Sequence, residues 1–103
     1  LPGAPVPRRV KIGTQVQAAN CLSCPPPRYP VQARMQRIQG VVRLHALINQ
    51  DGTVGDLAVV GTPPLVLAQA SIPTAKQWRY RPTLLNGEPV EVDTIIVINF
   101  SLR

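Results

Sequence analysis

The chain has few of the residues that usually carry out chemistry. Its 103 residues include one histidine, two cysteines and five acidic residues. No nucleophile stands in a pattern with a base and no pair of carboxylates suggests acid–base catalysis, so an enzyme is the weakest class of function. The apolar runs fall short of the ~20 residues that a membrane-spanning helix needs. Because the chain begins with leucine and shows no signal peptide, we expect a soluble fragment of a longer protein.

Acidic residues are outnumbered by basic ones. Eleven lysines and arginines against five acids give a formal net charge of +6 and a sequence pI near 10.4. Such a surplus invites a nucleic-acid-binding interpretation. The basic residues are scattered, however, with no dense run and no recognised motif, so solvated arginines explain them better. We expect no nucleic-acid partner.

Aromatic rings are also scarce, and two of the four are concentrated at one place. Trp78 and Tyr80 are two residues apart, which sends both side chains to one face of an extended strand and Arg79 and Arg81 to the other. Pro82 cannot donate to a strand ladder and is expected to end the pairing. The two rings are predicted to be structural anchors, with an exposed aromatic contact as the alternative.

The first part of the chain resembles a linker. Residues 1–13 hold three prolines and two glycines without sustained periodicity, and we place a Pro-rich linker end at 1–28 ahead of a domain at 29–103. Three further prolines at 25–27 should exclude a helix before Pro30.

Cys21 and Cys24 lie within this segment. A local disulfide is the simplest state in an oxidising compartment, and disulfides between two chains in a homodimer remain an alternative. A thioredoxin-like role needs a helix directly after the first cysteine, which the prolines oppose. Zinc would need two more ligands, and His45 is the only histidine, so we expect no metal or other cofactor.

Two helices are predicted. The first spans residues 30–39, with Val31, Met35 and Ile38 as its core-facing stripe and Gly40 as its stop. The second begins after Thr62 and has its own apolar stripe. That stripe comprises Leu65, Ala68, Ile72 and Ala75. Pro73 lies deep in this helix, so a kink or a restart is expected there.

A hairpin is predicted between the helices, at Asp51-Gly52. A two-residue turn pairs Ile48 with Gly55, Ala46 with Leu57 and Leu44 with Val59, which leaves one face wholly apolar. The other face is polar and should be at least partly wet. It carries Arg43, His45, Asn49 and Asp56. We interpret His45 as a solvated histidine.

The longest predicted strand covers residues 90–102, and alternate residues from Val90 onward form its apolar face. Ile95 and Val97 make the opposite face apolar as well, so something is expected to cover them. A strict two-residue turn at Asn86-Gly87 would place Tyr80 opposite Asp93. We therefore expect a wider loop, with residues 78–81 as a short extended piece.

These elements, taken in order and at this spacing from residue 29 to 102, resemble the TonB C-terminal domain family. The residues that carry the resemblance are Tyr29, Pro30, Gly40, Asp51, Gly52, Trp78, Tyr80, Pro82, Asn86, Gly87 and Phe100. The resemblance implies an α+β fold, with two helices packed on one face of a three-stranded, or four-stranded, antiparallel sheet.

The resemblance also implies a role and partners. Members of the family sit at the end of a periplasmic Pro-rich arm that leads back to an inner-membrane helix, which engages the ExbB and ExbD complex. The domain grasps the TonB box of an outer-membrane transporter and passes on energy from the proton-motive force. A TolA-like or sensor-attached periplasmic interaction module is the alternative.

The expected binding site is the edge of the last strand, where a peptide can add a strand. It comprises Thr94, Ile95, Ile96, Val97, Ile98, Asn99 and Phe100. Alternatively, this edge packs against the linker or another subunit. Further partner contacts are assigned to Tyr29, Arg79 and Arg81. A Gln-Pro pair that contributes to transporter contact in the family corresponds here to Pro26 and Pro27, so that contact does not carry over.

Overall fold

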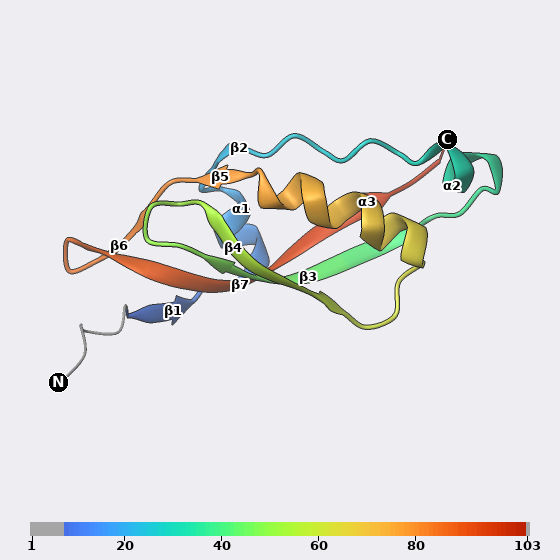
Figure 1. Ribbon diagram of the computed structural model, residues 1–103. Coiled ribbons are helices and arrows are strands. Elements are labelled where there is room, and N and C mark those ends of the chain that lie inside the picture. Colours follow the sequence, from blue (N-terminus) through green and yellow to red (C-terminus); the bar gives the residue numbers. More distant parts are fainter. Residues whose placement is uncertain (1–7, 103) are drawn as a thin grey trace, which may run out of the picture.

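The computed structural model describes residues 8–102. Within these residues ten elements follow one another (Figure 1). They are β1 (Arg9–Lys11), α1 (Thr14–Ala18), β2 (Cys21–Ser23), α2 (Val31–Met35), β3 (Gly40–Ile48), β4 (Val54–Val60), α3 (Leu65–Lys76), β5 (Arg79–Tyr80), β6 (Thr83–Leu85) and β7 (Glu88–Phe100).

The main sheet has five strands and is mixed. Its order is β1-β7-β3-β4, and β6 also pairs with β7. Strands β3 and β7 are antiparallel over nine residue pairs, from Gly40 opposite Phe100 to Ile48 opposite Val92, whereas β1 runs parallel to β7. A separate two-stranded sheet joins β2 to β5. The predicted three- or four-stranded antiparallel sheet with two helices is therefore wrong, although helices and strands do combine.

The error comes from the residues interpreted as linker. Residues 9–11 add the parallel strand, and the helix α1 forms at 14–18, well before Pro30. Val10 and Ile12 are half-buried, and the Ile12 amide donates to the Asp93 carbonyl at 3.0 Å. A three-residue strand is too short to show the alternation that identifies strands, so β1 could not be predicted from the sequence pattern. Residues 1–7 of the predicted linker lie outside the described residues.

The core lies on one face of the main sheet. Val42, Leu44, Ala46 and Ile48 of β3 are at most 1% exposed, and the even-numbered residues of β7 from Val90 to Phe100 are buried beside them. Helix α3 covers this face (Figure 1). On the opposite face Arg43 and His45 are exposed, as the alternation predicts.

Helix α2 is shorter than predicted, and two of the three residues of its predicted core-facing stripe are exposed, whereas Ile38 packs against the core. Val31 and Met35 are 70% and 79% exposed, and only Ala33 of this helix is buried. The chain leaves the helix at Arg37, which adopts a positive φ of 54°, and Gly40 is the first residue of β3 rather than a helix stop. A five-residue helix docks through one small residue, so its larger apolar side chains stay outside.

Helix α3 runs without interruption from Leu65 to Lys76, so the restart expected at Pro73 does not occur. Pro73 and Gln69 are both exposed, which leaves the Gln69 carbonyl, deprived of its usual donor, open to hydration. Leu65 is 72% exposed, contrary to prediction. The buried residues of the helix are Leu67, Ala68, Ser71 and Ala75.

Both hairpins differ from prediction close to their turns. Ala46–Leu57 and Leu44–Val59 pair as expected, but a register shift places Ile48 opposite Val54 instead of Gly55. The Asn49 amide donates to the Thr53 carbonyl and the Gly52 amide to the Asn49 carbonyl, so the turn is wider than two residues.

The turn at Asn86-Gly87 is, in contrast, a strict two-residue turn and not the wider loop that was expected. Leu85 lies opposite Glu88, and both turn residues have positive φ. The pairing extends back only to Thr83, because Pro82 interrupts it. Tyr80 therefore never faces Asp93, and residues 79–80 pair with β2 instead.

Gly52 should be the most sensitive glycine of the described part of the chain. Its φ is +89°, and a Cβ there would lie 1.9 Å from the Tyr80 carbonyl oxygen. The Gly52→Ala substitution is expected to lower the free energy of unfolding by about 3 kcal/mol or more, from left-handed strain and overpacking together. Urea denaturation measures the change.

Gly61→Ala is the matched control. Gly61 has a φ of +75°, and a Cβ there meets no atom of the described residues within 4 Å. The Gly61→Ala substitution should lower the free energy of unfolding only by the left-handed strain, about 1–2 kcal/mol. Equal losses for the two variants would contradict a close approach of Gly52 to Tyr80.

Candidate partner-binding edge

The outer side of β7 is only partly paired. Strand β1 pairs with residues 91–93 on this side, whereas β6 pairs with residues 88–90 on the side that β3 continues. The Glu91 amide donates to the Arg8 carbonyl, and the last backbone bond on this side runs from the Ile12 amide to the Asp93 carbonyl. Beyond Asp93, no strand within residues 8–102 pairs with this side of β7.

The pairing identifies which backbone groups are open. Since Glu91 and Asp93 direct their amides and carbonyls outward, the period of two assigns the same direction to Ile95, Val97 and Asn99. Of the seven predicted edge residues, these three offer backbone groups to a new strand. The other four direct their backbone toward β3 and are buried in the core. They are Thr94, Ile96, Ile98 and Phe100.

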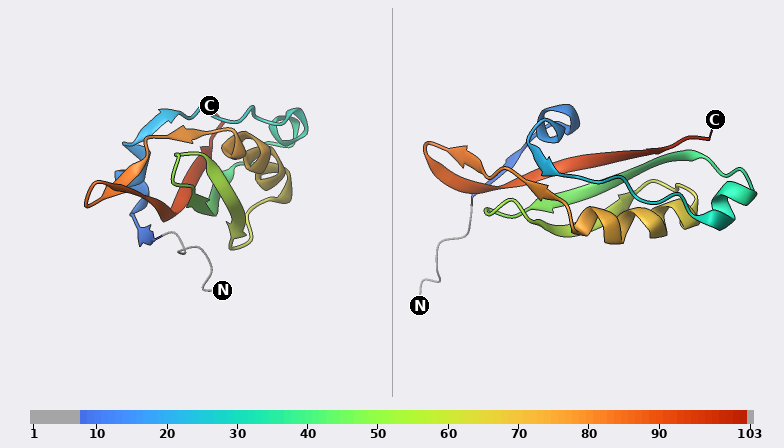
Figure 2. Two further views of the ribbon diagram at one scale, coloured as in Figure 1. Left: turned by 60° about the vertical axis from the view of Figure 1, so that its left-hand side comes forward. Right: turned by 90° about the horizontal axis from the view of Figure 1, so that it is seen from above.

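The open stretch is bordered by two cavities. One, of about 190 Å³, is lined by residues that include Gln17, Cys21 and Thr94. The other, of about 290 Å³, continues toward Phe100 beneath Pro26 and Pro27. Cys24, Trp78 and Val97 line both. The segment that leads from β2 to α2 forms the common wall, and it runs along β7 on the α3 side of the sheet (Figure 2).

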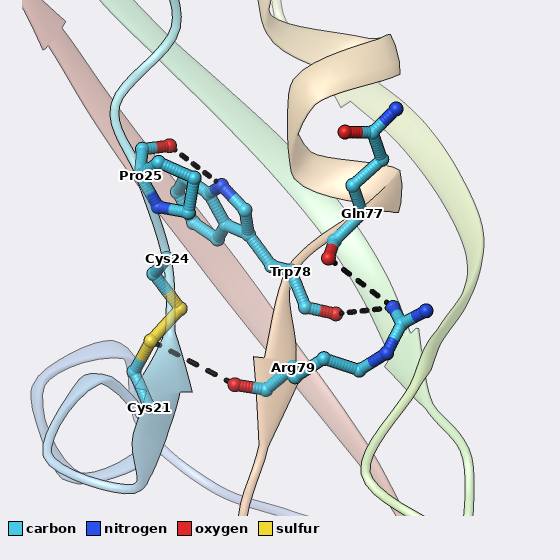
Figure 3. Close-up of a disulfide and its surroundings, with 6 residues drawn as sticks. All are labelled: Cys21, Cys24, Pro25, Gln77, Trp78 and Arg79. Atoms are coloured by element: carbon cyan, nitrogen blue, oxygen red, sulfur yellow. Dashed lines mark hydrogen bonds between the residues drawn. A yellow bond between two sulfur atoms is a disulfide. The ribbon is translucent and has the colours of Figure 1, made fainter.

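A disulfide and a tryptophan hold this wall in place (Figure 3). Cys21 and Cys24 are joined, and the Trp78 Nε1 donates to the Pro25 carbonyl at 2.8 Å. Strand β2 pairs with β5 directly after Trp78, with Cys21 opposite Tyr80. The indole is thus an anchor between α3 and the wall, and both predicted aromatic anchors are buried, at 8% and 4% exposure.

Tyr80 lines the smaller cavity, and its burial raises the pKa of the phenol above its ordinary value of 10.0. On the wet face of the sheet, the Nε2 of His45 lies 2.5 Å from the Oδ1 of Asp93 while the imidazole stays half exposed. His45 therefore has a side-chain partner as well as solvent.

Tyr29 lies at the far end of the open stretch. Its ring meets Phe100 edge-on with centroids 5.4 Å apart, and its hydroxyl donates to the Ile38 carbonyl. The Arg34 guanidinium lies 5.9 Å from the ring centroid. Tyr29 also lines the larger cavity, so a peptide there would touch a ring already held by its neighbours.

Arg79 and Arg81 are not part of this edge. Both are exposed, and neither lines the two cavities, because their side chains alternate with those of Trp78 and Tyr80. The Nη1 of Arg79 donates to the Gln77 and Trp78 carbonyls. Gln17 is a buried polar residue on α1, a helix that no sequence pattern predicted.

Comparison with known proteins matches residues 25–102 to the family described as Gram-negative bacterial TonB protein C-terminal. The chain belongs to this family. The TonB protein of Vibrio cholerae is 31% identical over 78 residues, which is 75% of this chain and 32% of that protein. The TonB protein of Escherichia coli K12 is 29% identical over 74 residues, which is 71% of this chain and 30% of that protein.

A solved TonB structure has a similar fold. The solution NMR structure of the Pseudomonas aeruginosa TonB C-terminal domain has a TM-score of 0.69 and 25% identity, covering 81% of this chain and 85% of that one. The chain spans about a third of the length of the curated TonB relatives. No helix among residues 8–102 is long and apolar enough to cross a membrane.

The TonB family match begins after the disulfide. It starts at Pro25, so β1, α1 and β2 precede the matched region. These elements nevertheless end the ladder on β7 and build part of the smaller cavity. The edge of this TonB domain is thus shaped by residues that the family match does not include.

Reducing the disulfide should loosen the wall measurably. Closing so short a loop restricts the unfolded chain, and its loss should lower the free energy of unfolding by about 2 kcal/mol. Urea denaturation with and without reductant measures the difference. A variant carrying both Cys21→Ser and Cys24→Ser is the control and should not respond to reductant. Identical curves for the unmodified protein would contradict a stabilising disulfide.

Proposed function

We propose that this domain is the periplasmic C-terminal domain of a TonB-type energy transducer and binds the TonB box of outer-membrane transporters. The bound segment adds a strand to β7 at Ile95, Val97 and Asn99. The observation that carries the proposal is the early end of the outer ladder at Asp93, while β7 itself continues to Phe100. An unpaired stretch of this kind is a template for an extended peptide.

Hydrogen-bond energies set the strength of this binding. Three outward residues offer three amides and three carbonyls. Each new bond contributes a net ~0.5–1.5 kcal/mol, and ordering the peptide subtracts from the sum. A modest affinity follows. The half-exposed Ile95 and the 44% exposed Val97 add apolar contact on the face opposite the core.

The proposed membrane anchor, its partners and the transmission of force rest on membership of the TonB family. A transducer of this kind has a membrane anchor in the part of the protein that precedes this fragment, and that anchor engages ExbB and ExbD. Cargo transport is then driven by force transmitted through the domain, without catalysis. The Cys21–Cys24 disulfide supports a periplasmic location, because disulfides persist in that compartment.

Val97→Pro tests the edge. It removes an outward amide without breaking a bond to β3, and it should weaken binding of a synthetic TonB-box peptide about tenfold or more. In the unmodified domain, the amide NMR signals of residues 95–99 should shift first on titration with the peptide.

Val59→Pro is the matched control. Val59 lies opposite Leu44 on β4, and its amide points outward from the other edge of the sheet. This variant should bind the peptide like the unmodified domain. Shifts confined to β4, or equal losses in both variants, would overturn the assignment of the site.

A further inference from the structure

Two buried polar side chains face the smaller cavity without partners. Gln17 is 2% exposed and Thr94 is 3% exposed. The Oε1 and Nε2 of Gln17 and the Oγ1 of Thr94 have no hydrogen-bond partner among the described residues. Both side chains line the same cavity of about 190 Å³.

Burying polar groups without partners lowers the stability of the fold, so their presence points to a ligand that pairs with them. Buried polar atoms in folded proteins nearly always have a partner, because an unpaired one forfeits its hydration. The rest of the cavity is largely apolar, with Trp78, Tyr80 and Ile96 among its walls. A few convergent polar groups in an apolar cavity are typical of a binding site.

The position of the cavity connects it to the open edge. Thr94 directly follows Asp93, where the ladder with β1 ends, and Ile95 is the first residue with open backbone groups. Ile95 and Val97 line the cavity as well. A strand added to β7 would therefore have one end at the cavity, where a side chain could enter.

We propose that this cavity is a specificity pocket for a carboxamide side chain, Gln or Asn, of the bound peptide. The inference rests on the proposed strand addition. A carboxamide offers both donors and an acceptor, so it can pair reciprocally with the Gln17 amide and also reach the Thr94 hydroxyl. A carboxylate has no donor and would carry its charge into an apolar site, and an aliphatic side chain would leave all three atoms unpaired.

Size supports a side chain as the occupant. The cavity is below the ~300–1,000 Å³ of sites that enclose whole small molecules. Gln17 comes from α1, which precedes the matched family region. The pocket is thus a feature that the N-terminal elements add to the strand-binding edge.

A peptide scan tests the proposal. The probes are TonB-box peptides in which each position in turn carries Gln, Leu or Glu, and binding is measured by calorimetry. At a single position, Gln should bind about tenfold more tightly than Leu or Glu. Gln17→Leu should abolish that preference. Gln15→Leu, at an exposed position of the same helix, should keep it.

Stability provides an independent readout. Gln17→Leu and Thr94→Val remove buried groups that have no partner in the free domain, so each should raise Tm or leave it unchanged while weakening the Gln peptide. A residue that only supported the fold would show the opposite, a lower Tm. Thr94→Val serves alone if Gln17→Leu does not fold.

The outcomes separate the two proposals. Peptides that bind at residues 95–99 with no preference for Gln, or with a preference that survives Gln17→Leu, overturn the pocket and leave strand addition standing. Peptides that bind nowhere on β7 overturn both. A lower Tm in both variants assigns Gln17 and Thr94 to the fold and also overturns the pocket.

Discussion

The nine-pair antiparallel ladder between β3 and β7 is the interaction on which the rest of the structure depends. It sets the register of the two longest strands, so the even-numbered residues of β7 from Val90 to Phe100 face the core. Helix α3 then packs on a face that is already continuous. The same ladder uses the inward backbone groups of β7 and leaves its outward groups to other partners. Core and candidate binding edge are thus two sides of one strand.

The outward groups of β7 are paired over only part of its length. Strand β1 pairs with residues 91–93, and the stretch beyond Asp93 is open among the described residues, while β6 pairs with residues 88–90 on the β3 side. After Ile12 the chain turns away into α1, so β1 cannot lengthen without removing that helix. The length of the open edge is therefore limited by where β1 stops. The wall beside it is stiffened by the disulfide and by the bond from Trp78 to Pro25.

The smaller cavity shows how stability and binding can compete. Gln17 and Thr94 keep polar atoms buried without partners, a cost that the β3–β7 ladder and the core must offset. Proteins commonly retain such costs at sites where a partner later satisfies them. The family resemblance does not lead to this feature, since α1 precedes the matched residues. The cavity forms only where α1 packs beside β7 in the folded domain.

The sequence by itself determined the elements that have their own periodicity or turn chemistry. The alternation along residues 90–100, the hairpin near Asp51-Gly52 and the burial of Trp78 and Tyr80 follow from side-chain period and local φ preferences, which need no distant partner. Tertiary structure alone decided the rest. A three-residue strand such as β1 is held by backbone bonds that any sequence can make, α2 docks through Ala33 rather than its larger apolar residues, and the pocket joins residues 17, 78 and 94. Contacts across such distances in the chain leave no local pattern from which they could be predicted.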